Sequence, residues 1–417
     1  MRSFPSAVVL LAGLILFCIF RRLQRHAHKE LHRRRLLIGM TKALSDEIVA
    51  RARKSVLLWI LGSGTLLMSC ASERPPVTSL APSPAQARAL IDRSLPRGVS
   101  DRAGWATDIY SGFTVQALEP TRQNVCAVVA VIEQESNFHV DPVVPRLGTM
   151  ARREIDQRAK RAGVPVSIVH GALELRSSTG RTYRERINAA KTEKDLSDIY
   201  EDFIGAVPLG RRLFADWNPV RTRGPMQVNI AFAESYASVR PYPYPVKVSV
   251  ADEVFTRRGS LYFGIAHLLA YRPPYDEYLY RFADFNAGQY ASRNAAFQKA
   301  VSKASGIALV TDGALLPHDS DVKGAGSTEL ALRALAKRLN ISEDAIHSDL
   351  EQGKTKEFER TQLYERVFAL AERVTRRRLP RAVVPSIKLH GPKISRSLTT
   401  SWYAHRVNGR FERCLRE

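Results

Sequence analysis

Apolar residues in this chain recur mainly at the three- and four-residue spacing of helices. Residues 124–132 are apolar at nearly every position and are followed directly by polar residues. A run this short predicts a buried helix and not a membrane span. Alternation typical of strands is confined to, at most, a small element near Gly224. The pattern therefore predicts a mainly α fold. Further helices are expected over 151–163, 184–203, 230–236, 278–287, 327–340 and 358–378.

The N-terminal part contains an apolar segment with the features of an export signal. Residues 55–70 are apolar, follow a basic stretch and end in Leu-Met-Ser-Cys, which resembles a bacterial lipobox. We expect a lipoprotein signal peptide over 40–70, with Cys70 lipidated, and a Pro/Ser-rich tether over 71–90. Ala71 after the cysteine favours an anchor in the outer membrane, with the protein facing the periplasm. An internal membrane helix is the alternative, although the segment is short for one.

A second apolar segment precedes this one. Residues 7–20 are apolar and are followed by an arginine-rich stretch over 21–35. By the positive-inside rule, residues 1–39 could contain a membrane helix with a cytoplasmic loop. The other interpretation is that translation starts at Met40, which is followed by a complete basic leader. Both interpretations stay open at this point.

Three short peptides, in a fixed order, contain the candidate chemistry: Glu-Gln-Glu-Ser-Asn-Phe at 133–138, Gly-Pro-Met-Gln-Val-Asn at 224–229 and Phe-Asn-Ala-Gly at 285–288. The first follows the apolar run directly, which puts Glu135 at the rim of an apolar pocket. A carboxyl there loses solvation in its charged form, so we expect its pKa to rise towards neutrality. Glu133 lies about 200° around the helix and cannot face the same cleft. Two solvated glutamates at a helix end are the alternative.

The second peptide has the residues of a turn or of a close approach to a ligand. Gly224 permits a tight turn, and Pro225 fixes one dihedral. If the segment is extended, Gln227 and Asn229 lie on one side and could hydrogen-bond sugar hydroxyl or acetamido groups. Met226 could pack against the pocket of Glu135. An ordinary turn that enters a helix is the alternative.

Together the three peptides resemble those of the lysozyme-like lytic transglycosylases, which cut the glycan strands of bacterial peptidoglycan. In that family Glu-Ser-x-Phe contains the acid, Gly-x-Met-Gln lines the sugar site and Tyr-Asn-Ala-Gly closes it. The resemblance implies a lysozyme-like catalytic domain over 91–306, a helical insertion at about 146–219 beside the cleft, and a helical C-terminal extension over 307–417. It selects Glu135 as the catalytic acid. The substrate-binding residues that it implies are Ser136, Met226, Gln227, Asn229, Phe285 and Asn286.

The mechanism implied by this resemblance uses one carboxyl group twice. Glu135 would protonate the glycosidic oxygen between N-acetylmuramic acid and N-acetylglucosamine. It would then act as a base while the muramic 6-hydroxyl attacks the anomeric carbon, which gives a 1,6-anhydro product. Hydrolysis would instead need a second carboxylate to activate water on the opposite face. Asp141 and Asp284 are near the motifs in sequence, but the motifs fix neither at the sugar.

Two departures from the family pattern favour an alternative function. Phe285 stands where the family commonly has a tyrosine whose hydroxyl lies near the acid, so the pocket loses a hydrogen-bonding group. Glu135 and Gly224 are 89 residues apart, which is more than in compact family members. The alternative is a catalytically weak cell-envelope lipoprotein that binds glycan or acts as a scaffold for other wall enzymes.

Composition and charge narrow the partners. The 417 residues are 45% hydrophobic, which allows a sizeable core, and the net charge is +22. A basic exported protein is attracted to anionic polymers such as peptidoglycan. A cytoplasmic DNA-binding protein would be favoured only by this charge and by a helix-turn-helix-like spacing over 335–350. Export argues against nucleic acid as a partner. Contact with the membrane is expected through the lipid anchor.

The remaining cysteines and the histidines predict no cofactor. In an oxidising periplasm Cys126 and Cys414 could form a disulfide that ties the C-terminal tail to the core helix. Cys126 could equally be an ordinary buried residue. The histidines lack metal-ligand spacing and no phosphate-binding loop is present, so neither a metal nor another cofactor is expected. Protein partners are not specified by any motif.

Overall fold

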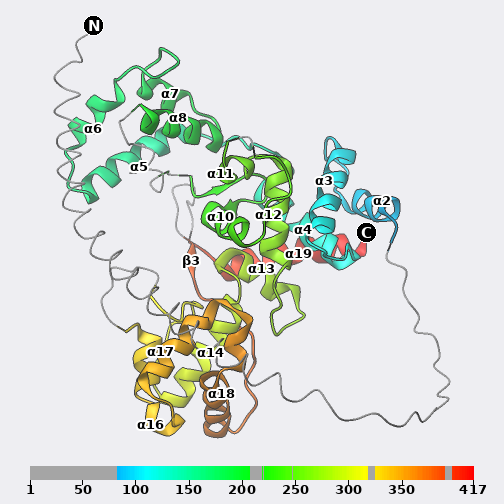
Figure 1. Cartoon of the computed structure of the whole chain (residues 1–417), viewed down its shortest axis with the longest axis vertical. Coiled ribbons are helices and arrows are strands. Elements are labelled where there is room, and N and C mark those ends of the chain that lie inside the picture. The colour runs from blue at the N-terminus through cyan, green and yellow to red at the C-terminus, as the bar shows by residue number, and fades with distance from the viewer. Residues whose placement is uncertain (1–81, 207–217, 219, 247, 318–324, 390–396) are drawn as a thin grey trace, which may run out of the picture. The chain divides into compact units, whose positions relative to one another are not determined.

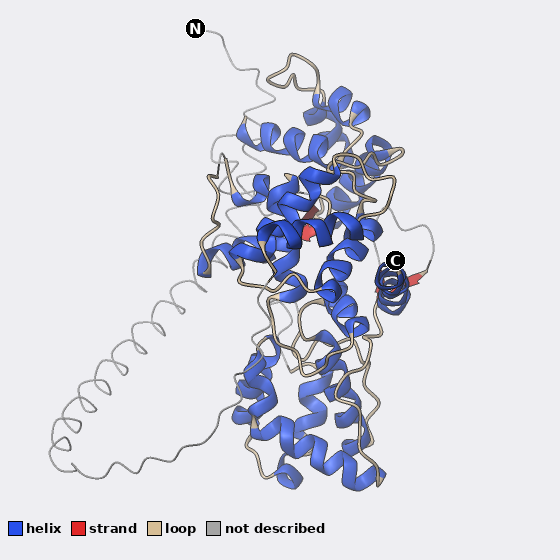
Figure 2. Ribbon diagram, turned by 90° about the vertical axis from the view of Figure 1, so that its right-hand side faces the viewer, coloured by secondary structure: helices blue, strands red, loops and turns tan. Residues whose placement is uncertain are grey.

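The computed structural model describes residues 82–206, 218, 220–246, 248–317, 325–389 and 397–417. Within the unit Leu80–Glu417 these residues form a mainly helical fold with very short strands (Figure 1 and Figure 2). The predicted mainly α class is therefore confirmed. The predicted signal peptide over 40–70, with its lipidated Cys70, and the segment 1–39 lie outside the described residues. None of the described helices has the length and apolar character needed to cross a membrane.

Helices account for nearly all of the regular structure. In the first half of the chain they are α2 (Pro84–Ser94), α3 (Arg102–Val115), α4 (Arg122–Glu135), α5 (Leu147–Arg161), α6 (Val166–Leu173), α7 (Tyr183–Ala189) and α8 (Glu193–Gly205). In the second half they are α10 (Ile230–Val239), α11 (Val250–Glu253), α12 (Arg257–Leu269), α13 (Tyr278–Ala287), α14 (Ala291–Ser305), α15 (Ser327–Arg333), α16 (Ala336–Leu339), α17 (Glu343–Glu351), α18 (Gln362–Thr375) and α19 (Thr400–Arg416).

Among the described residues, the strands form two short antiparallel pairs. β1 (Thr222–Arg223) pairs with β2 (Val228–Asn229), with Thr222 opposite Asn229. This hairpin is the small element that the sequence indicated near Gly224. β3 (Lys388–Leu389) pairs with β4 (Leu398–Thr399) just before the last helix begins.

The first core forms around α4, as the apolar run predicted. Residues 125–132 are all at most 2% exposed, because the run is apolar on every face of the helix and other helices surround it. Thr121 caps the start of α4 by accepting a hydrogen bond from the backbone N–H of Asn124. Helix α19 packs along both α4 and α13 (Figure 1). It contributes Tyr403, Val407 and Phe411 to this core.

The predicted boundary between a catalytic domain ending at 306 and a separate C-terminal extension needs correction. α14 lies before that boundary, yet it packs with α15 and α18 in a second core built around Phe297, Phe358 and Phe368. α19 lies at the end of the chain, yet it belongs to the first core. Burial of apolar faces, and not order along the chain, decides which helices form a core.

The expected helical insertion has a small core of its own. α5, α7 and α8 contribute Leu147, Ile187 and Ile199 to it, together with the more distant Phe255. The expected helix over 184–203 is divided at 190–192, because Thr192 accepts a hydrogen bond from the N–H of Asp195 and so starts α8 as a new helix. α6 was not among the helices expected from the sequence.

Two further predictions differ from the observed limits of the helices. The predicted tether over 71–90 is too long, because α2 begins at Pro84 after the capping residue Ser83 and buries Ala87 and Ile91 completely. The helix expected over 327–340 is divided into α15 and α16.

Candidate active site

Glu135 is the last residue of α4, and the chain turns sharply after it. Asn137 and Phe138 have left-handed φ values of 49° and 63°. Phe138 is then buried against Trp105, with ring centroids 5.2 Å apart. Ser136 is also buried, and its hydroxyl donates to the carbonyl of Ile132 at 3.2 Å. In this arrangement the hydroxyl of Ser136 is engaged within the helix end, and its implied contact with substrate stays a prediction.

The carboxylate of Glu135 is held by a residue from the far end of the sequence. The hydroxyl of Tyr403 on α19 donates to its Oε1 at 2.5 Å. Tyr403 is only 5% exposed, so this contact is desolvated on the tyrosine side. Burial and the negative charge of Glu135 both raise the pKa of Tyr403 well above its ordinary value. The phenol is therefore neutral and remains a hydrogen-bond donor.

Glu133, which also lies on α4, is paired with two arginines of α19. Its Oε1 lies 2.8 Å from Arg413 and 3.4 Å from Arg410. The two glutamates thus both reach α19, but one meets a pair of arginines and the other a phenol. Glu133 is balanced by cations, which suits a structural carboxylate. Glu135 is instead hydrogen-bonded to a neutral phenol, which can hold the carboxyl in either protonation state.

The third peptide lies at the end of α13, and α19 also contacts it. The hydroxyl of Thr400 donates to the side-chain oxygen of Asn286 at 2.8 Å. Thr400 and Tyr403 are three residues apart in α19 and therefore face the same side. Through this one face, α19 brings Glu135 and Asn286 into a common neighbourhood.

Phe285 points towards another helix. Its ring lies 5.1 Å from that of His267 on α12, and its carbonyl lies 3.2 Å from His267 Nε2. Phe232 also packs against this imidazole, with ring centroids 4.4 Å apart. Burial lowers the pKa of His267 to about 4, so the histidine is neutral at physiological pH. Phe285 therefore belongs to an aromatic cluster with His267 and Phe232.

The second peptide forms the turn of the β1–β2 hairpin, which corrects the extended conformation considered above. Gly224 has φ 71° and Gln227 has φ 48°, and the N–H of Gln227 donates to the carbonyl of Gly224 at 2.9 Å. Met226 is completely buried, and a Cβ added to Gly264 of α12 would lie 2.4 Å from its sulfur. Met226 thus packs against α12.

The polar residues of the second peptide form bonds within the protein. Gln227 accepts a hydrogen bond from the hydroxyl of Thr222 at 2.9 Å and donates to Glu193 of α8 at 3.1 Å. Asn229 caps α10 by accepting from the N–H of Phe232. The expectation that Gln227 and Asn229 share one side of an extended strand is therefore wrong. In these bonds both side chains stabilise the hairpin and its neighbours.

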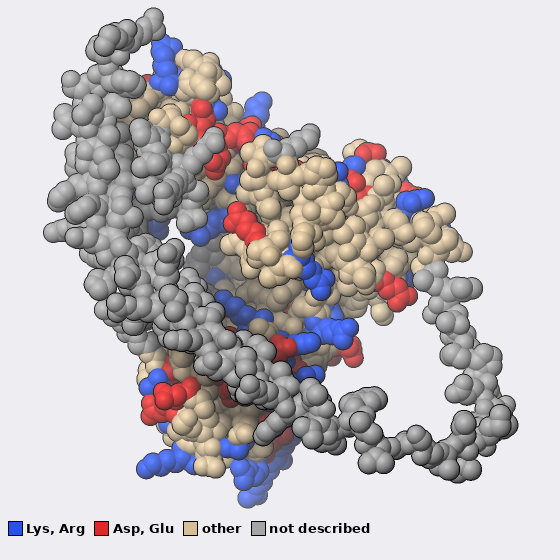
Figure 3. All heavy atoms as spheres, in the orientation of Figure 1, with Lys and Arg blue, Asp and Glu red and all other residues tan. Residues whose placement is uncertain are grey.

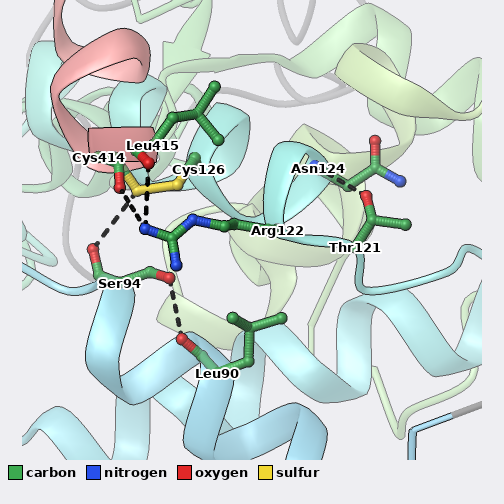
Figure 4. Close-up of a disulfide and its surroundings, with 8 residues drawn as sticks. All are labelled: Leu90, Ser94, Thr121, Arg122, Asn124, Cys126, Cys414 and Leu415. Carbon is green, nitrogen blue, oxygen red and sulfur yellow. Dashed lines mark hydrogen bonds between the residues drawn. A yellow bond between two sulfur atoms is a disulfide. The ribbon is translucent and has the colours of Figure 1, made fainter. Parts of the chain in front are cut away.

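A disulfide joins the start of α4 to the end of α19. Cys126 and Cys414 are bonded, with their Cα atoms 5.6 Å apart (Figure 4). The guanidinium of Arg122 donates to the carbonyl of Leu415 at 3.1 Å beside it. Since Tyr403 meets Glu135 near the other ends of the same two helices, the disulfide and the hydroxyl contact hold this helix pair together along its length.

Neither of the other carboxylates considered from sequence lies at Glu135. Asp284 is completely buried, and it accepts hydrogen bonds from the hydroxyls of Tyr271 and Tyr275 and from the N–H of Ser292. Its burial raises its pKa. Asp141 lies beside Thr192 at the insertion, and desolvation raises its pKa as well. The contacts found for Asp284 and Asp141 are with Tyr271, Tyr275 and Ser292 and with Thr192, and none of these joins either carboxylate to Glu135.

Charged side chains and a hollow lie on the surface away from the motifs. Among the described residues visible in Figure 3, both basic and acidic side chains are scattered over the surface. In the part of the chain that is described, no group of three or more His, Cys, Asp and Glu residues could hold a metal ion. A hollow between α5, α6 and α7 lies in the insertion and contains none of the motif residues.

Sequence reasoning missed Tyr403 and Thr400. They lie outside the three peptides, and Thr400 starts a helix that had been assigned to an extension. The one indication in the sequence was the candidate pairing of Cys126 with Cys414, which would bring the C-terminal tail to the core helix. Followed one step further, that pairing would have placed residues near 403 beside the other end of α4.

The fold and site define a mainly helical protein in which a disulfide-bonded C-terminal helix contacts a glutamate at the end of a buried helix. The chain belongs to the family described as "Protein of unknown function (DUF1615)", which matches residues 98–417. It is also similar to "Uncharacterized protein YaiW" of Escherichia coli (strain K12), with 48% identity over 352 residues that cover 84% of this chain and 96% of the relative. No solved structure matches it.

Proposed function

We propose that this protein is a peptidoglycan lytic transglycosylase of the bacterial cell envelope, with Glu135 as its acid and then its base. The observation that supports this most is the Glu135 carboxyl at the end of a buried apolar helix, where the hydroxyl of the buried Tyr403 donates to it. A single carboxyl beside a neutral hydroxyl donor suits a reaction in which one group first gives and then takes a proton.

The chemistry balances without a second acid. Glu135 gives its proton to the glycosidic oxygen as the bond from that oxygen to the muramic anomeric carbon breaks. The carboxylate then takes the proton of the muramic 6-hydroxyl as its oxygen bonds to the same carbon. The products are a free hydroxyl on N-acetylglucosamine and a 1,6-anhydro ring, and Glu135 is protonated again. No metal or other cofactor enters these steps.

The cell-envelope location is part of the proposal. A disulfide persists in oxidising compartments and is rare in the cytosol, so the Cys126–Cys414 bond favours export. Lipidation at Cys70 would anchor the protein to the outer membrane, facing the periplasm.

The test is digestion of purified peptidoglycan by the full-length protein in mild detergent, with the products read by mass spectrometry. Wild type should release muropeptides with 1,6-anhydro ends, and Glu135→Gln should release none. Glu133→Gln is the matched control, since it changes a neighbouring glutamate with a different partner, and it should retain activity. Products with reducing ends would overturn the transglycosylase chemistry in favour of hydrolysis. Equal loss in both variants would remove the assignment to Glu135.

A second candidate is a glycan-binding or scaffolding lipoprotein with little activity. It is favoured by the internal bonds of Gln227 and Asn229 and by the orientation of Phe285 towards His267. These residues were expected at the sugar, and their bonds lie within the fold. Sedimentation of the wild-type protein with insoluble peptidoglycan, without release of muropeptides, would favour this candidate.

A further inference from the structure

The C-terminal helix α19 contacts the candidate site at two residues on one face. Tyr403 donates to Glu135 and Thr400 donates to Asn286. Glu135 comes from α4 and Asn286 from α13, so these two helices are linked at the site through α19. Both donors are at most 5% exposed, and their hydroxyls are thus shielded from bulk water.

Three kinds of contact fix the position of this helix: hydrogen bonds at its start, ring stacking along it and a disulfide at its end. At its start Thr400 is bonded to Asn286, and Thr399 caps the first turn by accepting from the N–H of Trp402. At its end Cys414 is joined covalently to α4. Between these points Phe411 stacks on Tyr278 of α13 with ring centroids 4.7 Å apart. A hydroxyl held by a helix fixed at both ends is pre-organised and needs little ordering when the carboxyl reacts.

We propose that Tyr403 is a positioning residue for Glu135, holding the carboxyl and stabilising its charged form between the two proton transfers. The inference rests on the proposed function for its reaction, while the contact itself stands on geometry. A phenol that donates to a carboxylate favours the ionised state. When Glu135 has given up its proton, the bond from Tyr403 becomes charge-assisted and therefore stronger.

The same contact explains how the site retains a hydroxyl although Phe285 has none. The ring of Phe285 faces His267, so a hydroxyl added to it would extend into the surroundings of that cluster. Tyr403 reaches Glu135 from a different helix and from 268 residues further along the chain. The hydroxyl donor at the acid is thus supplied by α19.

The first experiment compares Tyr403→Phe with wild type in the full-length protein. Loss of a hydrogen bond to a charged group corresponds to about a 10- to 100-fold fall in kcat. The pH above which activity declines should also rise by about one unit, because the charged carboxylate has lost a donor. Tyr278→Phe is the matched control: it removes another half-buried phenol of the same core, which donates to Asn124 at 2.6 Å. It should leave the pH profile unchanged.

A rescue experiment tests whether α19 or α13 supplies the hydroxyl to Glu135. Phe285→Tyr added to Tyr403→Phe should not restore kcat, because residue 285 points towards His267. Restoration would overturn the inference, since it would show that a hydroxyl on α13 can serve Glu135 as well. The same pH profile in Tyr403→Phe and Tyr278→Phe would overturn it too, because both changes would then be merely structural.

A second readout needs no activity. In protein with 13C-labelled glutamate carboxyl groups, the Glu135 signal is the one absent from Glu135→Gln, and it can be titrated by NMR. Its midpoint should move to higher pH in Tyr403→Phe and stay in place in Tyr278→Phe. An unmoved midpoint would refute the contact between Tyr403 and Glu135. A wild-type protein that releases no anhydro products, but shows the shift, would remove the proposed function and leave the contact established.

Discussion

Removing the disulfide between Cys126 and Cys414 should release α19 from the first core. The bond closes a loop between residues 288 positions apart, which is nearly the whole of the described unit. A crosslink of this kind stabilises mainly by reducing the entropy of the unfolded chain, and its effect grows with loop length. The long separation therefore predicts a large entropic stabilisation of the folded state by this bond.

The expected magnitude follows from loop length and burial. The chain-entropy relation gives about 5–6 kcal/mol for a loop of this size, while measured losses commonly lie at about 2–5 kcal/mol. Cys126 is completely buried and Cys414 is 8% exposed, so replacing both by alanine also removes some packing. We expect the double variant Cys126→Ala/Cys414→Ala to be about 2–5 kcal/mol less stable than the oxidised wild type.

Urea unfolding measures the loss, and hydrogen exchange locates it. Reduced wild type serves as the control for packing, because it keeps both sulfur atoms without the crosslink. Addition of a reductant should destabilise wild type and leave the double variant unchanged. Amide protection should fall most over 400–416, while 362–375 in the second core keeps its protection. A loss below about 1 kcal/mol, or equal loss of protection in both cores, would refute the view that this bond holds α19.

Three further changes test particular features of the fold. Gly224→Ala should destabilise more than Gly163→Ala, although both positions have left-handed φ: a Cβ at Gly224 would lie 2.2 Å from the carbonyl oxygen of Val254, whereas Gly163 has open space. Urea midpoints that fall equally would refute the contact. Because the pKa of His267 is about 4 in the fold against an ordinary 6.5, the free energy of unfolding should be about 3 kcal/mol higher above pH 6.5 than near pH 4. His267→Gln should flatten this part of the stability profile, and an unaltered slope would contradict it. Asp284→Asn should cost about 3 kcal/mol in thermal or urea unfolding, because its NH2 group would replace one acceptor oxygen and face either the hydroxyls of Tyr271 and Tyr275 or the N–H of Ser292. A cost near zero would mean that this acceptor role is dispensable.

The helices of the motif region were predictable because their determinants are local. The apolar run at 124–132 lies within α4, and the helix expected at 278–287 matches α13. Gly288 follows α13 with φ 111°, a conformation that glycine adopts without cost. In each case spacing and capping residues within about 15 positions decide the element, and these can be read directly from the sequence.

The candidate site was predictable only in part, because its contacts are long-range. The position of Glu135 at a helix end followed from the apolar run. The bonds of Gln227 depended on α8, in a segment whose docking no local pattern specifies. The roles of Tyr403 and Thr400 depended on α19 returning to α4 and α13. Helical spacing identifies an apolar face, but it does not identify which partner that face will cover.

The return of α19 has a consequence for any shortened form of this protein. Val407 and Phe411 fill the first core from α19, so loss of the helix would expose apolar surface on α4 and α13 together with Glu135. Phe285 faces His267 and has no hydroxyl, so it cannot replace the phenol. A chain ending before Thr400 should therefore lose the fold of this core and the arrangement of the site together. Tyr403→Phe keeps the apolar ring in place and should change the chemistry of Glu135 alone. The difference between these two variants separates the packing role of α19 from its role at the carboxyl group.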